Sequence, residues 1–181
     1  MQSGIRRLGW HMASAIVLLL PQTVSSKVSS ADATGFTIES TASVPVSPHE
    51  AYAAFVDVAR WWDPVHTWSG NAANLSIDAR AGGCFCETLP DGGSVQHMQV
   101  VYAAPGEQLR LVGGLGPLQE QSVAGSMTWT FAPAEGGCTI GLTYRVAGRI
   151  EGEGGAESWA APVDFVLGSQ LERLSKLLSG H

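Results

Sequence analysis

The stretch from Ser158 to Leu178 constrains the fold of this chain more than any other. Its apolar residues recur every three or four positions, which places them on one face of an α-helix. Pro162 fits the first turn of such a helix, where its missing N–H group costs little. The apolar face comprises Val163, Val166, Leu167, Leu171, Leu174, Leu177 and Leu178. A helix of this kind needs a partner surface, which the upstream sequence must supply.

That upstream sequence is predicted to form mainly β-strands. Apolar and polar residues alternate in short segments that are rich in β-branched and aromatic residues. Most of these segments are separated by breaks that contain Gly or Pro and are short enough for hairpins. Neighbouring strands should therefore pair antiparallel. The predicted strands are Phe36 to Val44, Asn74 to Ala79, Cys84 to Leu89, Val95 to Ala103, Gln108 to Gly113, Ser126 to Phe131 and Cys138 to Val146.

Two short helices are predicted between the first and second of these strands. Ser47, Pro48 and Glu50 form a capping box with proline at the first helical position, which indicates a helix from Pro48 to Val58. A second helical turn follows at residues 59–63 and ends before Pro64.

The first 33 residues are predicted to be an export signal. Arg6 and Arg7 form a basic n-region, Met12 to Leu20 is an apolar run, and the sequence Ala31-Asp32-Ala33 could be cut after Ala33. The apolar run is too short to span a bilayer, so no membrane span is expected after cleavage, although an uncleaved anchor is the alternative. Residues 34–181 would then be a single domain in a bacterial periplasm or outside the cell, reached by either the general or the twin-arginine route.

The composition excludes one class of partner. The formal net charge is -6, and no cluster of Lys and Arg follows the leader. A nucleic-acid surface needs such a basic patch, so nucleic acid is not an expected partner.

Cys84, Cys86 and Cys138 are three thiols, an odd number that leaves at least one unpaired within the chain. Cys84 and Cys86 lie two apart in a predicted strand, where a mutual disulfide would be strained. We therefore expect small buried side chains, with a disulfide to Cys138 as the alternative. A C-x-C motif without further ligands is weak evidence for a metal, and neither metal nor cofactor is predicted.

Several motifs together resemble the START-like helix-grip (SRPBCC) superfamily. The similarity is to its bacterial branch, which includes activator-of-Hsp90-ATPase homologues and polyketide cyclases. The motifs are Ser47 to Tyr52 leading to Trp61-Trp62, Gly82 to Phe85, Val100 to Leu111, Met127 to Phe131 with Cys138 to Tyr144, and Trp159 to Leu178. The resemblance implies an α+β fold with a curved seven-stranded antiparallel sheet around the C-terminal helix.

The resemblance also implies an apolar cavity between sheet and helix that holds a small hydrophobic or amphipathic molecule. The first alternative is a cyclase- or hydrolase-type enzyme using His66, Glu87 or His97 as acid–base groups. A further alternative is a protein-interaction module, which should expose a large apolar patch. The export signal and the C-x-C motif depart from the usual cytosolic members, and the ligand and the oligomeric state stay open.

The residues expected to bind the ligand are mostly large and apolar. They are Trp61, Trp62, Trp68, Met127, Trp129, Phe131, Trp159, Val163, Leu167, Gln170 and Leu171. Alternation places Glu87 opposite Cys84 and Cys86, and His97 opposite Met98, without deciding which face of either strand lines the cavity. Asp164 is expected at the solvent edge, because an unpaired carboxylate is costly to bury.

Overall fold

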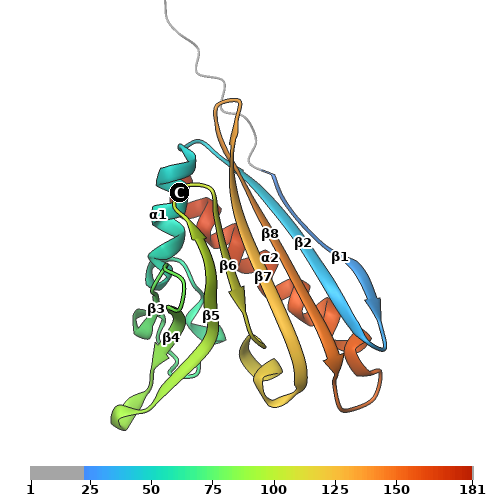
Figure 1. The fold of residues 1–181 in the computed structure, drawn as a ribbon. Helices are drawn as coiled ribbons and strands as arrows, with labels where there is room; N and C mark the ends of the chain where they lie inside the picture. The colour runs from blue at the N-terminus through green and yellow to red at the C-terminus, as the bar shows by residue number, and fades with distance from the viewer. Residues whose placement is uncertain (1–22, 181) are drawn as a thin grey trace, which may run out of the picture.

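The computed structural model describes residues 23–180. An antiparallel sheet of eight strands curves around the long C-terminal helix α2 (Gly155–Ser179), in the order β1-β2-β8-β7-β6-β5-β4-β3 (Figure 1). The strands are β1 (Val24–Asp32), β2 (Gly35–Val44), β3 (Leu75–Ile77), β4 (Cys84–Thr88), β5 (Ser94–Ala104), β6 (Gln108–Val112), β7 (Ser122–Ala134) and β8 (Gly137–Arg149). The predicted α+β class, with an antiparallel sheet and a long C-terminal helix, is confirmed.

The predicted number of strands, seven, was wrong, because β1 adds an eighth at the edge beside β2. Its residues belong to the segment assigned to the export signal, whereas Arg6, Arg7 and the run Met12–Leu20 lie outside the described residues. β1 is rich in serine and lacks a strong apolar alternation, so it gives little signal on its own.

Contacts with α2 explain why β1 is ordered. Ser26 Oγ donates a hydrogen bond to Asp164 Oδ1 at 2.5 Å, which links the strand to the helix. A methyl group added at Gly168 would lie 3.0 Å from Ser26 Cβ, so glycine permits the close approach of strand and helix. Asp164 was expected at the solvent edge, but it is half-buried and accepts this hydrogen bond.

Only one α-helix lies between β2 and β3, where two were predicted. Helix α1 (Pro48–Val56) has the predicted capping box, since Ser47 N donates to Glu50 Oε2 at 2.9 Å and Ser47 Oγ accepts from Glu50 N. Three turns of 3-10 helix follow, at η1 (Val58–Arg60), η2 (Pro64–His66) and η3 (Ala72–Asn74). This irregular path buries the indoles of Trp61 and Trp62, whose Nε1 groups donate to the carbonyl oxygens of Phe55 and His66.

Helix α2 presents its apolar face to the concave side of the sheet, and Leu167, Leu171 and Leu174 are fully buried there. The helix begins at Gly155, so Pro162 lies within it and not in the predicted first turn. Within residues 23–180, no helix has the length and apolarity needed to cross a membrane.

An irregularity in the pairing of β4 with β5 shapes the sheet near one end. Phe85 pairs with Met98 and Cys86 pairs with Gln96, so His97 is an extra residue, a β-bulge. The bulge turns His97 to the buried side together with Met98, which strict alternation does not allow.

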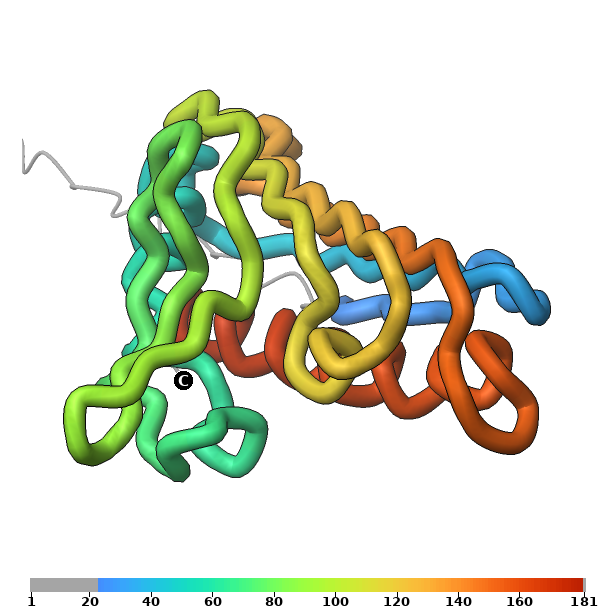
Figure 2. Tube along the Cα trace, turned by 60° about the horizontal axis from the view of Figure 1, so that its bottom comes forward, coloured from blue at the N-terminus to red at the C-terminus, as the bar shows by residue number. Residues whose placement is uncertain are grey.

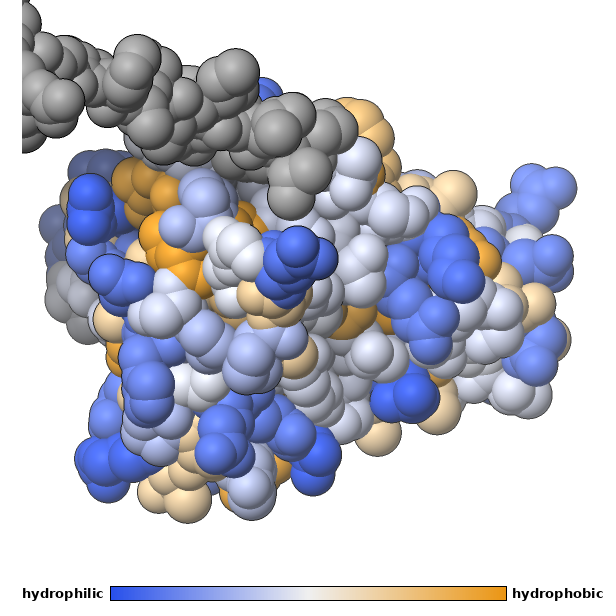
Figure 3. All heavy atoms as spheres, turned by 90° about the horizontal axis from the view of Figure 1, so that it is seen from above, coloured by the Kyte–Doolittle hydropathy of each residue, from blue (hydrophilic) through white to orange (hydrophobic). Residues whose placement is uncertain are grey.

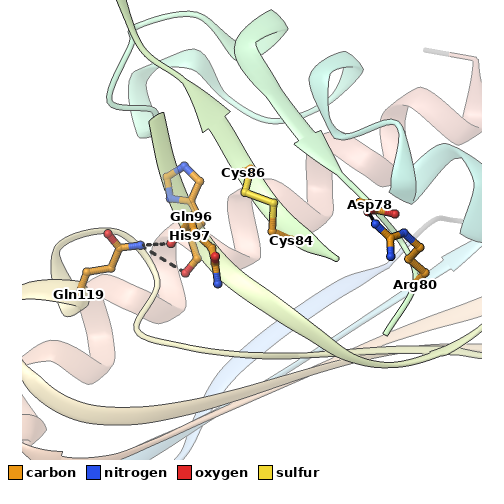
Figure 4. The surroundings of a disulfide bond; sticks show 7 residues. All are labelled: Asp78, Arg80, Cys84, Cys86, Gln96, His97 and Gln119. Atoms are coloured by element: carbon orange, nitrogen blue, oxygen red, sulfur yellow. Dashed lines mark hydrogen bonds and ion pairs between the residues drawn. A yellow bond between two sulfur atoms is a disulfide. The ribbon is translucent and has the colours of Figure 1, made fainter. Parts of the chain in front are cut away.

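A disulfide lies opposite this bulge and joins Cys84 to Cys86 (Figure 4). The sequence favoured small buried thiols at Cys84 and Cys86, with a disulfide to Cys138 as the alternative, and both predictions were wrong for this pair. Cys138 is a buried free thiol. The Cα atoms of Cys84 and Cys86 are 5.4 Å apart, whereas two residues of a regular strand span about 6.6 Å. The local shortening of the strand makes the bridge between neighbouring positions possible.

Candidate functional site

A pocket of about 320 Å³ lies between the first half of α2, the loop around η2, and η5 (Gly116–Glu120). Figure 2 shows the loops that carry η2 and η5 beside α2 at the end of the sheet that comes forward in that view. The wall is mainly apolar, and its residues are Trp62, Val65, His66, Thr67, Trp68, Phe85, His97, Leu115, Gly116, Pro117, Leu118, Tyr144, Trp159, Pro162, Val163, Val166 and Leu167.

The structure brings part of the predicted ligand-binding set to this pocket. Trp62, Trp68, Trp159, Val163 and Leu167 line it, together with the acid–base candidates His66 and His97. The other predicted residues are buried but do not line it, and they are Trp61, Met127, Trp129, Phe131, Gln170 and Leu171.

Aromatic packing explains why several of these side chains form core instead of pocket wall. The ring of Phe55 from α1 lies 4.7 Å from that of Trp129 and 5.5 Å from that of Phe131, measured between centroids. Trp61 joins the same cluster, with its ring 6.0 Å from that of Phe55. Helix α1 therefore covers Trp129 and Phe131, two side chains that were predicted to contact a ligand.

Gln170 holds the backbone near the pocket. Its Oε1 accepts a hydrogen bond from Asp63 N at 2.8 Å, and Arg173 Nε on the next turn donates to Trp61 O at 2.8 Å. These two bonds attach the segment before η2 to α2.

Sequence reasoning missed Phe85, Leu115 and Leu118 as pocket residues. Phe85 shares the inner face of β4 with Glu87, a phase that the sequence left open. Leu115 lies in a Gly- and Pro-containing break between two predicted strands, and Leu118 directly follows that break. No periodic pattern marks either residue.

Glu87 and His97 form a buried pair beside the pocket. The side chains are 0 and 4% exposed, and His97 Nε2 lies 2.9 Å from Glu87 Oε2. The same carboxylate accepts backbone N–H groups from Trp68 at 3.1 Å and from Ser69 at 2.6 Å. Glu87 thus connects the loop after η2 to the bulge in β5.

The environment favours a carboxylate beside a neutral imidazole. Burial alone would raise the pKa of Glu87, but hydrogen bonds from Ser69, Trp68 and His97 outweigh it and hold that pKa below its ordinary value. Burial lowers the pKa of His97, although Glu87 opposes this change. A carboxylate only accepts hydrogen bonds, so it places the imidazole proton on Nε2 and leaves a lone pair on Nδ1.

Two other polar side chains of the wall, Tyr144 and Thr67, are already paired. Tyr144 Oη accepts from Leu115 N at 3.0 Å and donates to Gly113 O at 3.2 Å, and burial raises its pKa to about 12. Thr67 Oγ1 donates to Pro64 O at 2.7 Å. By contrast, His97 Nδ1 is buried and has no hydrogen-bond partner within the described part of the chain.

His66 lies at the exposed rim of the pocket. Val65 and Trp68, also in this region, are 76 and 50% exposed, and Phe165 on α2 is 72% exposed. At the opposite end of the molecule, seen from above, the visible surface mixes hydrophilic and neutral residues with several hydrophobic areas, the clearest on the left of the view (Figure 3). Among residues 23–180, no group of three or more His, Cys, Asp or Glu side chains is placed to hold a metal ion.

Comparison with known proteins matches residues 35–179 to a family described as polyketide cyclase / dehydrase and lipid transport. Solved structures with this fold include CalU16 from Micromonospora echinospora (14% identity, TM-score 0.56, covering 88% of this chain and 84% of that one). Protein Ms6760 from Mycobacterium smegmatis is 18% identical, with a TM-score of 0.56, covering 89% of this chain and 99% of that one.

The di-domain ARO/CYC StfQ from the steffimycin biosynthetic pathway is also similar, at 16% identity and a TM-score of 0.54. The match covers 81% of this chain and 51% of StfQ. Identities this low show a shared fold only. No curated protein matches the sequence.

Proposed function

Because the chain belongs to the polyketide cyclase / dehydrase and lipid transport family, we propose that it binds a small hydrophobic or amphipathic molecule in the pocket beside α2. The observation that carries this proposal is the pocket itself, whose volume of about 320 Å³ and largely apolar wall suit such a ligand. Trp62, Trp159 and Val163 supply apolar surface, and His97 supplies a polar group that can orient the ligand.

The first experiment asks whether the pocket holds a ligand. The purified full chain is analysed by native mass spectrometry, and bound molecules are extracted into organic solvent. A Val163→Trp variant should fill the pocket and abolish the bound mass, because Val163 lies in its wall. Val101→Trp is the matched control, since Val101 is 44% exposed on β5 and does not line the pocket. Equal ligand content in both variants would refute binding in this pocket.

We further propose that binding takes place after export, in a periplasm or outside the cell. The basic pair Arg6 and Arg7 before the apolar run Met12–Leu20 supports this proposal. A disulfide between Cys84 and Cys86 is also more usual in an oxidising compartment. Replacing Leu18 and Leu19 by Arg should retain the protein in the cytoplasm, which cell fractionation measures. A wild-type chain found only in the cytoplasm would contradict export.

Acid–base catalysis is the second candidate, and the Glu87–His97 pair is the observation that favours it. The Nδ1 lone pair of His97 could take a proton from a molecule in the pocket, with the imidazolium stabilised by Glu87. Turnover of aryl esters and 1,3-diketones should then fall by about 10²- to 10⁴-fold in His97→Gln. Absence of turnover by the wild-type chain would leave ligand binding as the supported function.

A further inference from the structure

We propose that the pocket selects hydrophobic molecules that carry a hydroxyl group, and that Nδ1 of His97 accepts the hydrogen bond from this hydroxyl. The inference rests on the proposed ligand-binding function and specifies the chemical class of the ligand. Phenols and apolar alcohols belong to this class.

His97 Nδ1 is a buried polar atom without a hydrogen-bond partner in the described part of the chain. Three buried side-chain atoms have no hydrogen-bond partner in the described part of the chain, namely Tyr52 Oη, His97 Nδ1 and Gln170 Nε2. Of these residues, His97 alone lines the pocket. Buried polar atoms are normally paired, so an unpaired one in a pocket wall indicates a partner that the ligand supplies.

The hydrogen bonds of Glu87 decide which kind of ligand group can pair with His97 Nδ1. Glu87 is held as an acceptor by the backbone N–H groups of Trp68 and Ser69, so it receives the Nε2 proton of His97. Nδ1 of the neutral ring is therefore an acceptor, and the ligand group that pairs with it must be a donor. A ketone or ether oxygen has no hydrogen to donate.

Packing and hydrogen bonds hold His97 in a fixed position. The β-bulge directs His97 toward the pocket, and the ring of Phe85 lies 4.9 Å from the imidazole between centroids. The Gln119 side chain of η5 donates to the carbonyl oxygens of Gln96 and His97 at 2.8 and 3.3 Å (Figure 4). The acceptor is thus fixed before the ligand arrives, which improves selectivity for a donor at one position.

No hydroxyl group of the same wall has a hydrogen free to pair with His97 Nδ1. Tyr144 Oη donates its hydrogen to Gly113 O, and Thr67 Oγ1 donates its hydrogen to Pro64 O. An apolar ligand without a hydroxyl would leave His97 Nδ1 unpaired, whereas a hydroxyl at that depth would satisfy it.

Two probes of similar shape test the inference, 2-naphthol and 2-methylnaphthalene, whose dissociation constants are measured with the full chain. The ratio of the 2-methylnaphthalene constant to the 2-naphthol constant should fall about tenfold from wild type to His97→Phe, which keeps a ring but removes the acceptor. His49→Phe is the control, because His49 is exposed and does not line the pocket, and its ratio should equal that of wild type.

Nitrogen NMR of the wild-type chain gives a second measurement that needs no variant. The Nδ1 resonance of His97 should shift when 2-naphthol is added and stay in place with 2-methylnaphthalene. If both probes bind, an unchanged ratio in His97→Phe or an unmoved Nδ1 resonance overturns the hydroxyl preference and leaves hydrophobic binding intact. If neither probe binds although native mass spectrometry finds a ligand in the pocket, this inference fails and the binding function stands; if neither measurement finds a ligand, both fail.

Discussion

Glu87 is the residue on which the local structure around the pocket depends. Its two carboxylate oxygens accept three N–H groups, from Trp68, Ser69 and His97, and the side chain is fully buried. An amide at this position has one oxygen and one NH₂ group, so at least one N–H donor would face another donor.

We therefore expect Glu87→Gln to lower the free energy of unfolding by about 1–3 kcal/mol, the usual cost of a buried unpaired polar group. Urea denaturation measures this change. Glu39→Gln serves as the control, because Glu39 is partly exposed and its Oε2 lies 3.8 Å from Lys27 Nζ in a surface ion pair. Surface substitutions of that kind change stability by about 0.5 kcal/mol or less. Equal effects of the two substitutions would contradict the role of Glu87.

The buried pair of Glu87 and His97 should make the protein less stable in acid. The pKa of His97 lies below the ordinary value of 6.5 in the folded state, so the unfolded chain takes up this proton first as the pH falls. Stability contributed by neutral His97 is therefore fully present above about pH 6.5 and declines below it. The pKa of Glu87 is also lowered in the folded state, so its contribution is present above pH 4.5 and is lost as the pH falls through the folded value.

Urea midpoints measured between pH 8 and pH 4 check this dependence. In His97→Phe, the decline that begins near pH 6.5 should become shallower, because the histidine that resists protonation is gone. The matched control variant is His49→Phe, because His49 is exposed and does not line the pocket. An identical pH profile in His97→Phe would contradict this assignment.

At the scale of elements, the bulge in β5 and the disulfide in β4 form one structural unit. Cys84 and Cys86 point away from the pocket, while Phe85 and Glu87 between and after them point inward. Reduction would let the 5.4 Å Cα spacing relax toward the regular value of about 6.6 Å, which the bulge at His97 must then accommodate.

We expect reduction to cost little global stability but to loosen the strands beside the pocket. The bridge closes a loop of only three residues, so the unfolded chain gains little freedom, and the loss should be about 1.5 kcal/mol or less. Hydrogen exchange of the β4 and β5 amides should rise on reduction, while the amides of β7 and β8 serve as the internal reference. Equal exchange in the oxidised and reduced chain would show that the disulfide does not support the bulge.

At the scale of the whole molecule, the sequence predicted the elements whose periodicity is strong. Strands β2 to β8 and helix α2 follow directly from alternating or three-and-four spacing, and the capping box at Ser47 located α1. What escaped prediction depends on contacts between distant parts of the chain. β1 is defined by Ser26, Asp164 and Gly168, and the inward turn of His97 is defined by a bulge that no single segment encodes.

The pocket was predictable only in part for the same reason. Val163 and Leu167 lie together in its wall, because the geometry of a regular helix fixes their positions relative to one another. Trp129 also faces the interior, but Phe55 of α1 covers it, and the packing of α1 cannot be read from β7 alone. Leu115 and Leu118 belong to a 3-10 turn with no periodic pattern.

Cleavage after Ala33 would remove all of the edge strand β1 from the sheet. Val24, Val28 and Ala31 pack partly against the core, and Asp164 would lose its hydrogen bond from Ser26. Burial of a Val side chain contributes about 1.5–3 kcal/mol when complete, so two half-buried valines and the lost hydrogen bond together predict a loss of about 2–4 kcal/mol. We expect a chain beginning at Thr34 to unfold at a lower urea concentration than one beginning at Thr23.

A Ser26→Ala variant of the longer chain removes the hydrogen bond to Asp164 but keeps the strand, so it should lose only a part of this stability. Equal urea midpoints for the two chain lengths would mean that β1 adds no stability, and that cleavage after Ala33 leaves the domain intact.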